Sequence, residues 1–482
     1  MRKYYFLFGD GSKVNQILCA VLINLPVFAY GASIGWMSPM TLLLQGEHSP
    51  RGTPLTASEV SWMAAVAYLT SVPANYLVAF MGDKIGRKIT LLFVSAMLCA
   101  CWILKLSSMD TWAFILARAF VGVSMAGCYV TCPLYTKEIS QDCIRGFLGS
   151  LTILFHTTGN LLLYVIGDLM SYRPILWTCL AMPTLHLVLF LMMPESPSYL
   201  VKQGNLEEAA RVVAWLRCRK EDDPKVFQEL DFIRKEQKKD EESSKFVFKA
   251  ICDIFRAFLI ALVIALAREA CGAVPVLNFA GEIFALASEG SGLVLTPNQQ
   301  AMMLGAVQVL GSTLAASVVE KAGRKPLLFV TSFLSGLSMC LLASWFLARE
   351  YSLIWPAWMP ITVLCICIFC DSSGLQPLTV IVTGEIFSYK YRGTVMATTM
   401  SVASFVDFLQ MLFFKPLANA VGIHVSFYFF GVICIAAAIY VILVLPETKQ
   451  RPLEEIYEDM KSKKEKKTDI ETQENEKEIY VF

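Results

Sequence analysis

Long runs of apolar residues alternate with short polar segments along this chain. A helix that crosses a hydrocarbon core of about 30 Å needs roughly 20 consecutive apolar residues. Runs of that size form two groups of six, separated by a charged stretch at 195–250. Twelve spans are therefore predicted, at about 14–36, 60–81, 89–107, 112–133, 147–168, 174–193, 254–284, 299–319, 327–347, 357–383, 395–415 and 424–445.

Three short charged motifs between these runs occur twice, in the same order and about 240–250 residues apart. The repeated pairs are 82–88 (GDKIGRK) with 319–325 (VEKAGRK), Glu138 and Arg145 with Glu385 and Arg392, and 194–196 (PES) with 446–448 (PET). An ordered repeat of this kind indicates two homologous halves. We predict an all-α membrane protein with twelve transmembrane helices, in two pseudo-symmetric six-helix bundles with a small cytoplasmic helical insert.

Composition supports a membrane protein and narrows the chemistry. The chain is 56% hydrophobic and 17% charged, with a mean hydropathy of +0.55, which is far more apolar than a soluble protein of 482 residues requires. A net charge of +1 argues against a nucleic-acid partner. No P-loop, nucleophile–base pair or metal-ligand spacing stands out, so we expect neither an enzyme nor a cofactor.

Basic residues predict the orientation in the bilayer. The loops that carry the repeated motifs hold most of the lysines and arginines, and the positive-inside rule places those loops and both termini in the cytoplasm of a multi-pass plasma-membrane protein. The expected parts are a cytoplasmic N-terminus (1–13), an N-terminal bundle (14–193), a cytoplasmic helical linker (194–252), a C-terminal bundle (253–445) and a largely disordered tail (446–482). In the linker, Leu206, Ala209, Val213 and Leu216 recur at helical spacing and favour short amphipathic helices over a solvated loop.

The carboxylates of the repeated motifs need a further explanation. Positive-inside charge accounts for the lysines, but not for acidic residues at fixed spacing beside arginines. We interpret the set as inter-helix salt bridges that form a cytoplasmic gate, with charges of no dynamic role as the alternative. The predicted gate residues are Asp83, Arg87, Arg118, Glu138, Arg145, Glu320, Arg324, Glu385 and Arg392.

These motifs also resemble the signatures of a known family. GDKIGRK, the segment 135–146 (YTKEISQDCIRG), PESPSYL at 194–200, VEKAGRK, GEIFSYKYRG at 384–393 and PETKQRPLEEI at 446–456 are similar to motifs of the sugar-porter branch of the major facilitator superfamily. The end of the first span, 35–39 (GWMSP), is similar to that of insect facilitated trehalose transporter-like proteins. The resemblance implies alternating access by two bundles, with a sugar site at mid-membrane. We expect a monomer whose partners are a small sugar or related solute and the lipid bilayer.

The predicted centre of the membrane departs from that family. Sugar porters usually carry a Gln-Gln-x-x-Gly-x-Asn run in the seventh span, and this chain has REACGAV at 268–274, which keeps only Gly272. Each sugar hydroxyl that loses water without gaining a partner costs about 1–3 kcal/mol, so polar groups must line the site. The candidate substrate-binding residues are Gln308, Arg268, Glu269, Asn278, His156, Asn160 and Gln376.

Arg268 and Glu269 are the unusual members of this set, because they fall in the middle of the predicted seventh span. Neighbouring helical residues point about 100° apart, so we expect the two side chains to face different places. Asp371 and Asp407 are the nearest partners by topology. Either Arg268 forms a structural bridge to a carboxylate, or these groups line a charged cavity for a solute that is not a plain hexose. Tyr129, Tyr135 and Tyr164 form no recognisable cluster and are expected to pack.

The predicted function is facilitative (uniport) transport of a trehalose- or hexose-like sugar by alternating access. Proton-coupled members of the family usually have an aspartate in the first span, where this chain has Ser33, which cannot titrate. Two alternatives stay open: a non-transporting sensor or degenerate paralogue, and a facilitator of a charged or non-hexose organic solute.

Overall fold

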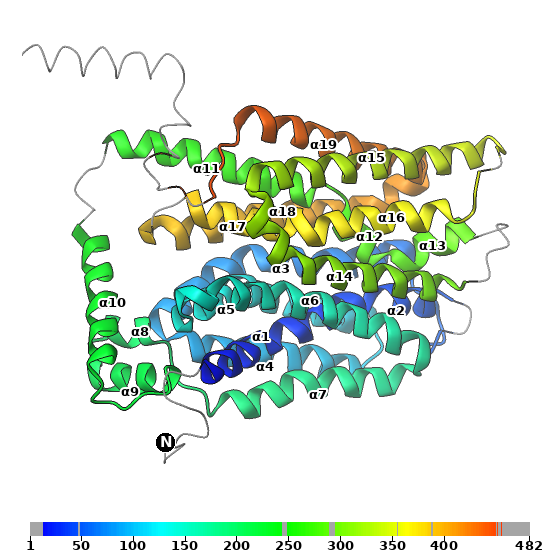
Figure 1. Cartoon of the computed structure of the whole chain (residues 1–482). Coiled ribbons are helices and arrows are strands. Elements are labelled where there is room, and N and C mark those ends of the chain that lie inside the picture. The colour runs from blue at the N-terminus through cyan, green and yellow to red at the C-terminus, as the bar shows by residue number, and fades with distance from the viewer. Residues whose placement is uncertain are drawn as a thin grey trace, which may run out of the picture.

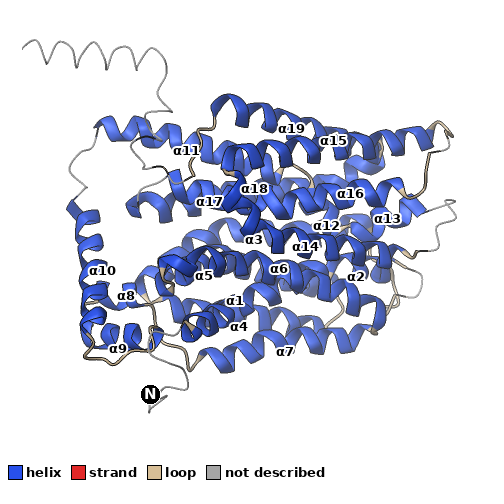
Figure 2. Cartoon of the chain, in the orientation of Figure 1, coloured by secondary structure: helices blue, strands red, loops and turns tan. Residues whose placement is uncertain are grey.

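The computed structural model describes most of the chain as helices joined by short turns. The described residues are 13–46, 49–242, 248–288, 295–353, 355–386, 389–449, 451 and 455. The N-terminus at 1–12 and the tail beyond residue 455, where disorder was expected, lie outside them. No strand occurs in the described ranges, and Figure 2 shows the same all-helical composition.

Nineteen helices make up the described chain, several of them segments of one span. The N-terminal half contains α1 (Val14–Gly35), α2 (Met37–Gln45), α3 (Ala57–Lys84), α4 (Arg87–Ser107), α5 (Thr111–Ile139), α6 (Asp142–Leu169) and α7 (Tyr172–Phe190). The insert contains α8 (Pro197–Lys202), α9 (Leu206–Leu216) and α10 (Pro224–Glu242). The C-terminal half contains α11 (Phe248–Glu269), α12 (Ala273–Asn278), α13 (Ala280–Ser288), α14 (Pro297–Ala322), α15 (Arg324–Glu350), α16 (Met359–Cys370), α17 (Gln376–Ile386), α18 (Tyr389–Val421) and α19 (Ile423–Val444).

The predicted twelve-helix, two-half architecture is confirmed. Among the described residues, eleven helical segments are long and apolar enough to cross a membrane. The predicted eighth span is found as α14, a helix of 26 residues that presents Gln308 to a cavity inside the protein.

The two halves lie side by side with their helices roughly parallel, as Figure 1 shows. α3 packs along α18, and α6 packs along α14, so these four helices form most of the contact between the halves. α8–α10 lie at one end of the bundles, where α1 begins and α19 ends. We call this the insert end and the opposite one the far end.

The insert is helical, as predicted, and it is attached to the N-terminal half. Ala209, Val213 and Leu216 form the buried side of α9, whereas Leu206 at its start is exposed. The side-chain amide of Asn15 donates to the carbonyl oxygen of Trp215 at 2.7 Å. Arg217, the residue that follows α9, donates to the carbonyl oxygen of Ile139 at 2.9 Å. The insert is therefore held to the ends of α1 and α5.

The seventh and tenth spans are both interrupted. Within the predicted seventh span at 254–284, α11 ends at Glu269 and the helix resumes at Ala273. Gly272 adopts φ +82° at this break, and a Cβ there would collide with the ring of Phe430. In the tenth span, α16 and α17 are joined by a π-helical turn at Asp371–Leu375. Such turns often occur at functional sites.

Candidate functional site

A cavity lies between the two halves and is lined by helices of both. Its empty space, counted together with the part that is open to solvent, is about 750 Å³. Six of the seven predicted substrate-binding residues line it: Arg268, Glu269, Asn278, His156, Gln308 and Gln376. Asn160 does not reach the cavity surface, but its side-chain amide donates to Gln308 Oε1 at 2.9 Å and holds that side chain in place.

The break in the seventh span positions the charged wall of the cavity. Arg268 and Glu269 were expected to face different places, and this is wrong: both line the cavity and form an ion pair with each other. They occupy the last two positions of α11, where the helix stops and two long side chains can turn toward the same space. Arg268 Nε also lies 3.5 Å from Asp371 Oδ1 on the π-helical turn.

Asp407 from α18 completes this wall. Its carboxyl lies against that of Glu269, and Asp407 is 2% exposed. The same helix, α18, also holds the end of α11 in place, because the side-chain amide of Gln410 donates to the carbonyl oxygen of Glu269 at 2.9 Å. The cavity thus brings three carboxyl groups and one guanidinium together. Asp371 and Asp407 were recognised in the sequence only as possible partners of Arg268, and both line the cavity themselves.

The N-terminal half supplies an aromatic wall that the sequence did not reveal. The ring of Tyr30 stacks on His156 with centroids 5.4 Å apart and meets Tyr129 edge-on at 5.9 Å. The expectation that Tyr129 belongs to no cluster is therefore wrong. Tyr135 and Tyr164 are buried away from this wall and make hydrogen bonds to backbone carbonyl oxygens. In the sequence, tyrosines within apolar runs cannot be told apart as lining or packing residues.

Amide side chains connect the two walls. Asn278 Nδ2 lies 3.2 Å from the hydroxyl oxygen of Tyr68, which joins α12 to α3 across the cavity. Gln376 Oε1, just after the π-helical turn, has no hydrogen-bond partner among the described residues. Amide and hydroxyl groups at this place can exchange hydrogen bonds with a polyhydroxylated solute.

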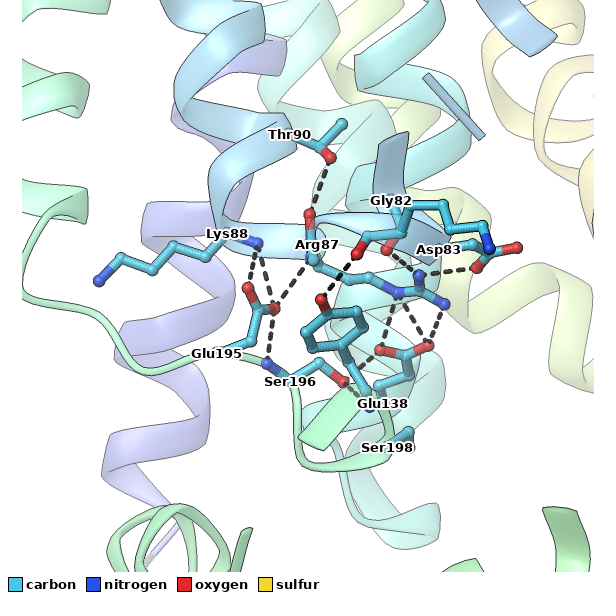
Figure 3. A network of polar contacts seen from close by, with 12 residues as sticks. Gly82, Asp83, Arg87, Lys88, Thr90, Glu138, Glu195, Ser196 and Ser198 are labelled. Carbon is cyan, nitrogen blue, oxygen red and sulfur yellow. Dashed lines mark hydrogen bonds and ion pairs between the residues drawn. The ribbon is translucent and has the colours of Figure 1, made fainter. Parts of the chain in front are cut away.

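The repeated motifs form one network in each half at the insert end. In the N-terminal half, Arg87 contacts Asp83 at 2.8 Å and Glu138 at 3.2 Å, as Figure 3 shows. Glu195 accepts hydrogen bonds from the backbone N–H groups of Arg87 and Lys88, at 2.9 and 3.1 Å. A carboxylate at this place is favourable, because the first N–H groups of α4 have no partner within the helix.

The C-terminal half repeats this arrangement. Arg324 contacts Glu385 at 2.7 Å, and its backbone N–H donates to Glu447 at 3.0 Å. Thr448 donates to Glu385 at 2.6 Å, in the place of the contact between Ser196 and Glu138 in the other half. The inter-helix pairing predicted from the repeat is therefore present in both halves, and each network lies within its own half.

Four of the predicted gate residues lie outside these pairs as described, and the prediction for Arg118 is wrong. Arg118 is fully buried and lies about 30 Å along α5 from Glu138, near the far end of that helix. Its guanidinium donates to the carbonyl oxygens of Met63 and Ser33, so it is not part of a gate at the insert end. Arg145 lies at the insert end and donates to the carbonyl oxygen of Ser140 at 3.5 Å. The side chains of Glu320 and Arg392 lie outside the described part of the chain.

At the far end, hydrogen bonds join the two halves. The backbone N–H of Gly281 donates to Ser38 Oγ at 2.8 Å, which connects α13 with α2. Lys415 Nζ lies 2.8 Å from Glu282 and 3.4 Å from Gln45 Oε1 of the other half. These contacts close the halves together on that side of the cavity.

Comparison with known proteins agrees with this architecture. Residues 7–460 match the family described as "Sugar (and other) transporter". The human "Solute carrier family 2, facilitated glucose transporter member 6" is 28% identical over 93% of this chain and 93% of its own. The "Facilitated trehalose transporter Tret1" of Bombyx mori is 25% identical over 92% of this chain and 86% of its own.

Solved structures show the same fold. The proton:xylose symporter XylE bound to 6-bromo-6-deoxy-D-glucose superposes with a TM-score of 0.74, at 18% identity, over 94% of this chain and all of that one. An inward-open form of the Escherichia coli xylose transporter XylE gives a TM-score of 0.73 over 92% of this chain and 99% of that one. With a family match that covers nearly its whole length, this chain belongs to the sugar (and other) transporter family of the major facilitator superfamily.

Proposed function

We propose that the chain is a facilitative transporter of a sugar or a similar polyhydroxylated solute, moved by alternating access of the two halves. The observation that carries this proposal is the polar cavity, whose walls come from helices of both halves. A site shared by two bundles changes its exposure when the bundles rock against each other. The relatives named for facilitated glucose and trehalose transport make a hexose or trehalose the first solutes to test.

Passive transport is favoured by the first span. Ser33 occupies the position at which proton-coupled sugar porters usually have an aspartate, and its carbonyl oxygen accepts a hydrogen bond from Arg118 at 3.0 Å. At this position the guanidinium donates to a backbone oxygen rather than to a titratable side chain. We infer a uniporter that works as a monomer in the plasma membrane, without a nucleic-acid partner.

Uptake of labelled D-glucose and trehalose into proteoliposomes tests this function directly. We expect saturable counterflow that is absent from protein-free vesicles. Gln308→Ala removes a lining amide and should weaken uptake about tenfold, whereas Thr313→Ala, on an exposed face of the same helix, should not. If no solute in a broad screen is taken up by well-folded protein, the chain is a degenerate paralogue or sensor instead.

The insert end is proposed to face the cytoplasm. In that orientation, the contacts at the far end close the outer side, and the networks of Arg87 and Arg324 belong to the cytoplasmic gate. Cys143 at the start of α6 offers a test, because it is the exposed one of the described cysteines. A membrane-impermeant thiol reagent should label Cys143 only from the cytoplasmic side, which is accessible in inside-out vesicles, and Cys143→Ser should remove the label at this position. Labelling of this residue in intact cells would show that the insert end faces the outside of the cell and would contradict the proposed orientation.

A further inference from the structure

Among the described residues, the ionisable groups of the C-terminal cavity wall are three carboxyl groups and one guanidinium. The carboxyl groups belong to Glu269, Asp371 and Asp407, which are 7%, 1% and 2% exposed. Arg268 is the single arginine or lysine among the described residues that line it. If all four groups are ionised, the wall has one positive and three negative charges. Buried ions are stable only when they are paired and hydrogen-bonded, so this wall requires further positive charge or further donors.

Arg268 does not meet this requirement alone. It forms an ion pair with Glu269, and its contact with Asp371 is 3.5 Å long. Within the described part of the chain, neither carboxyl oxygen of Asp371 accepts a hydrogen bond, and Asp407 Oδ1 also lacks a donor. These are side chains at least 98% buried whose acceptor atoms are unused at the cavity wall. Leaving such acceptors unpaired costs about 1–3 kcal/mol each, and more when they are charged.

The opposite wall carries three tyrosines. Tyr30, Tyr68 and Tyr129 line the cavity from α1, α3 and α5. An aromatic ring attracts a positively charged group that lies over its face within about 6 Å. The carboxylates are complementary to a positive charge, whereas a neutral sugar would leave them without compensation.

The polar neutral groups of the cavity are suited to hydroxyls. Gln308, Asn278 and Gln376 lie around the same space, and an amide both donates and accepts. A protonated amine provides three donors and one positive charge, but no acceptor. The lining therefore corresponds to a solute with a cationic amine at one end and hydroxyl groups over the rest.

We propose that the transported solute is a cationic polyhydroxylated amine, such as an amino sugar, with its ammonium group bound by Asp371 and Asp407. This inference rests on the proposed transport function and specifies its substrate class. A proton bound by one of the carboxyl groups would reduce the same negative charge. In that case a neutral sugar, rather than a cationic one, would be transported together with the proton.

The test compares D-glucosamine with D-glucose and N-acetyl-D-glucosamine in proteoliposomes, at a mildly acidic pH where the amine of glucosamine is protonated. N-acetylation keeps the bulk at that position and removes the charge. We expect glucosamine to compete for uptake at least about tenfold better than either neutral sugar, since hydrogen bonds to charged groups are roughly twice as strong as neutral ones. Its uptake should also carry a saturable inward current.

Variants connect this preference to the two aspartates. Asp371→Asn and Asp407→Asn should each reduce the preference for glucosamine about tenfold or more. Glu350→Gln is the matched control, because that carboxylate is 63% exposed at the far end and does not line the cavity. If an asparagine variant fails to fold, Asp371→Glu and Asp407→Glu keep the charge and should retain the preference with altered affinity.

Each outcome supports or overturns one statement. Equal competition by all three sugars overturns the cationic substrate and leaves sugar transport intact. A current with neutral glucose, together with proton uptake, also overturns it and assigns the carboxyl groups to proton transport. No uptake of any of these sugars, or of trehalose, by folded protein overturns the proposed function itself.

Discussion

The guanidinium of Arg87 lies 3.2 Å from the carboxylate of Glu138, and both residues belong to the N-terminal half. Arg324 and Glu385 repeat this contact at 2.7 Å in the C-terminal half. The charged motifs thus join neighbouring helices of one bundle at its insert end. A bundle held together in this way can rock as a unit, because its helices keep their positions relative to one another while the interface between the halves changes.

Glu138→Gln should destabilise the protein by about 3–5 kcal/mol, because Arg87 would keep a nearly buried charge without its main partner. The side chains of Arg87 and Glu138 are 9% and 4% exposed. Asp83→Asn is the control on the same guanidinium. Asp83 is 56% exposed, so its loss should cost at most about 1 kcal/mol. Chemical unfolding of the purified protein measures both, and equal effects would show that burial does not determine the strength of this network.

Glu195 and Glu447, which bind the first N–H groups of α4 and α15, have pKa values shifted in opposite directions. Burial raises the pKa of Glu195, and hydrogen bonds from backbone N–H groups offset this only in part. Burial also acts to raise the pKa of Glu447, but the N–H groups of Arg324, Lys449 and Lys325 lower it overall.

These shifts predict opposite pH dependence for two variants. A lowered pKa gives stability above the pKa of unfolded glutamate, about 4.3, and this is lost as the pH falls through the folded value. A raised pKa gives stability below the unfolded value, which is lost as the pH rises through the folded value. Glu447→Gln should therefore cost more at neutral pH than at about pH 4, and Glu195→Gln the reverse. Melting temperatures relative to wild type at both pH values measure this, and parallel trends would contradict it.

Arg268 and Asp371 should be energetically coupled. Arg268→Gln leaves a carboxylate that is 1% exposed without its guanidinium, and Asp371→Asn removes one of the two carboxylates that Arg268 contacts. Each variant should lose stability, by about 3–5 kcal/mol for Arg268→Gln. The double variant should lose less than the sum, with a coupling of about 1–3 kcal/mol.

Solute affinity separates a structural bridge from a binding residue. If Arg268→Gln folds and its affinity and selectivity are unchanged, the ion pair only holds helices together. A change of about tenfold or more in the affinity for any transported solute would place Arg268 in the binding site. Radioligand competition with purified protein provides this measurement.

Gly281→Val should disfavour closure at the far end. A Cβ at Gly281 would lie 2.7 Å from Leu42 Cδ1 of the other half, closer than side chains normally approach. Such overpacking costs about 1–3 kcal/mol, and it acts only when α13 and α2 are together. Gly149→Val is the control, because a Cβ at that glycine meets nothing within 4 Å.

The readout is a cysteine introduced at Met400, which lines the cavity. An impermeant reagent supplied at the far end should label it about tenfold faster in the Gly281→Val background, because the population with an open far end increases. An unchanged labelling rate would show that the close approach of α13 and α2 does not limit opening.

Much of the fold could be predicted from the sequence because its signals are local. Apolar runs of bilayer length define the spans, and the repeated motifs predicted both the two halves and salt bridges between helices, which the structure shows as the pairs Arg87–Glu138 and Arg324–Glu385. Gly272 lies at the break in the seventh span, but the sequence did not show that α11 ends at Glu269. The membrane allows few alternatives, since every backbone polar group within it must be satisfied by a helix or a barrel.

The functional site depended on contacts that the sequence does not show. Arg118 was assigned to the gate because it is an arginine in a span beside gate residues, yet its position along α5 places it near the far end. Tyr30 gave no signal at all, because a tyrosine in an apolar run is also an ordinary packing residue.

The sequence by itself determined the twelve-helix, two-half architecture, the charged networks and the polar groups available to a cavity. Only the tertiary structure decided which of them meet: Glu269 and Asp407 are 138 positions apart in the chain and lie against each other at the cavity wall. The physical reason is that apolarity and helix breaks act over one or two turns. The rotation and depth of each helix, in contrast, are set by packing against its neighbours.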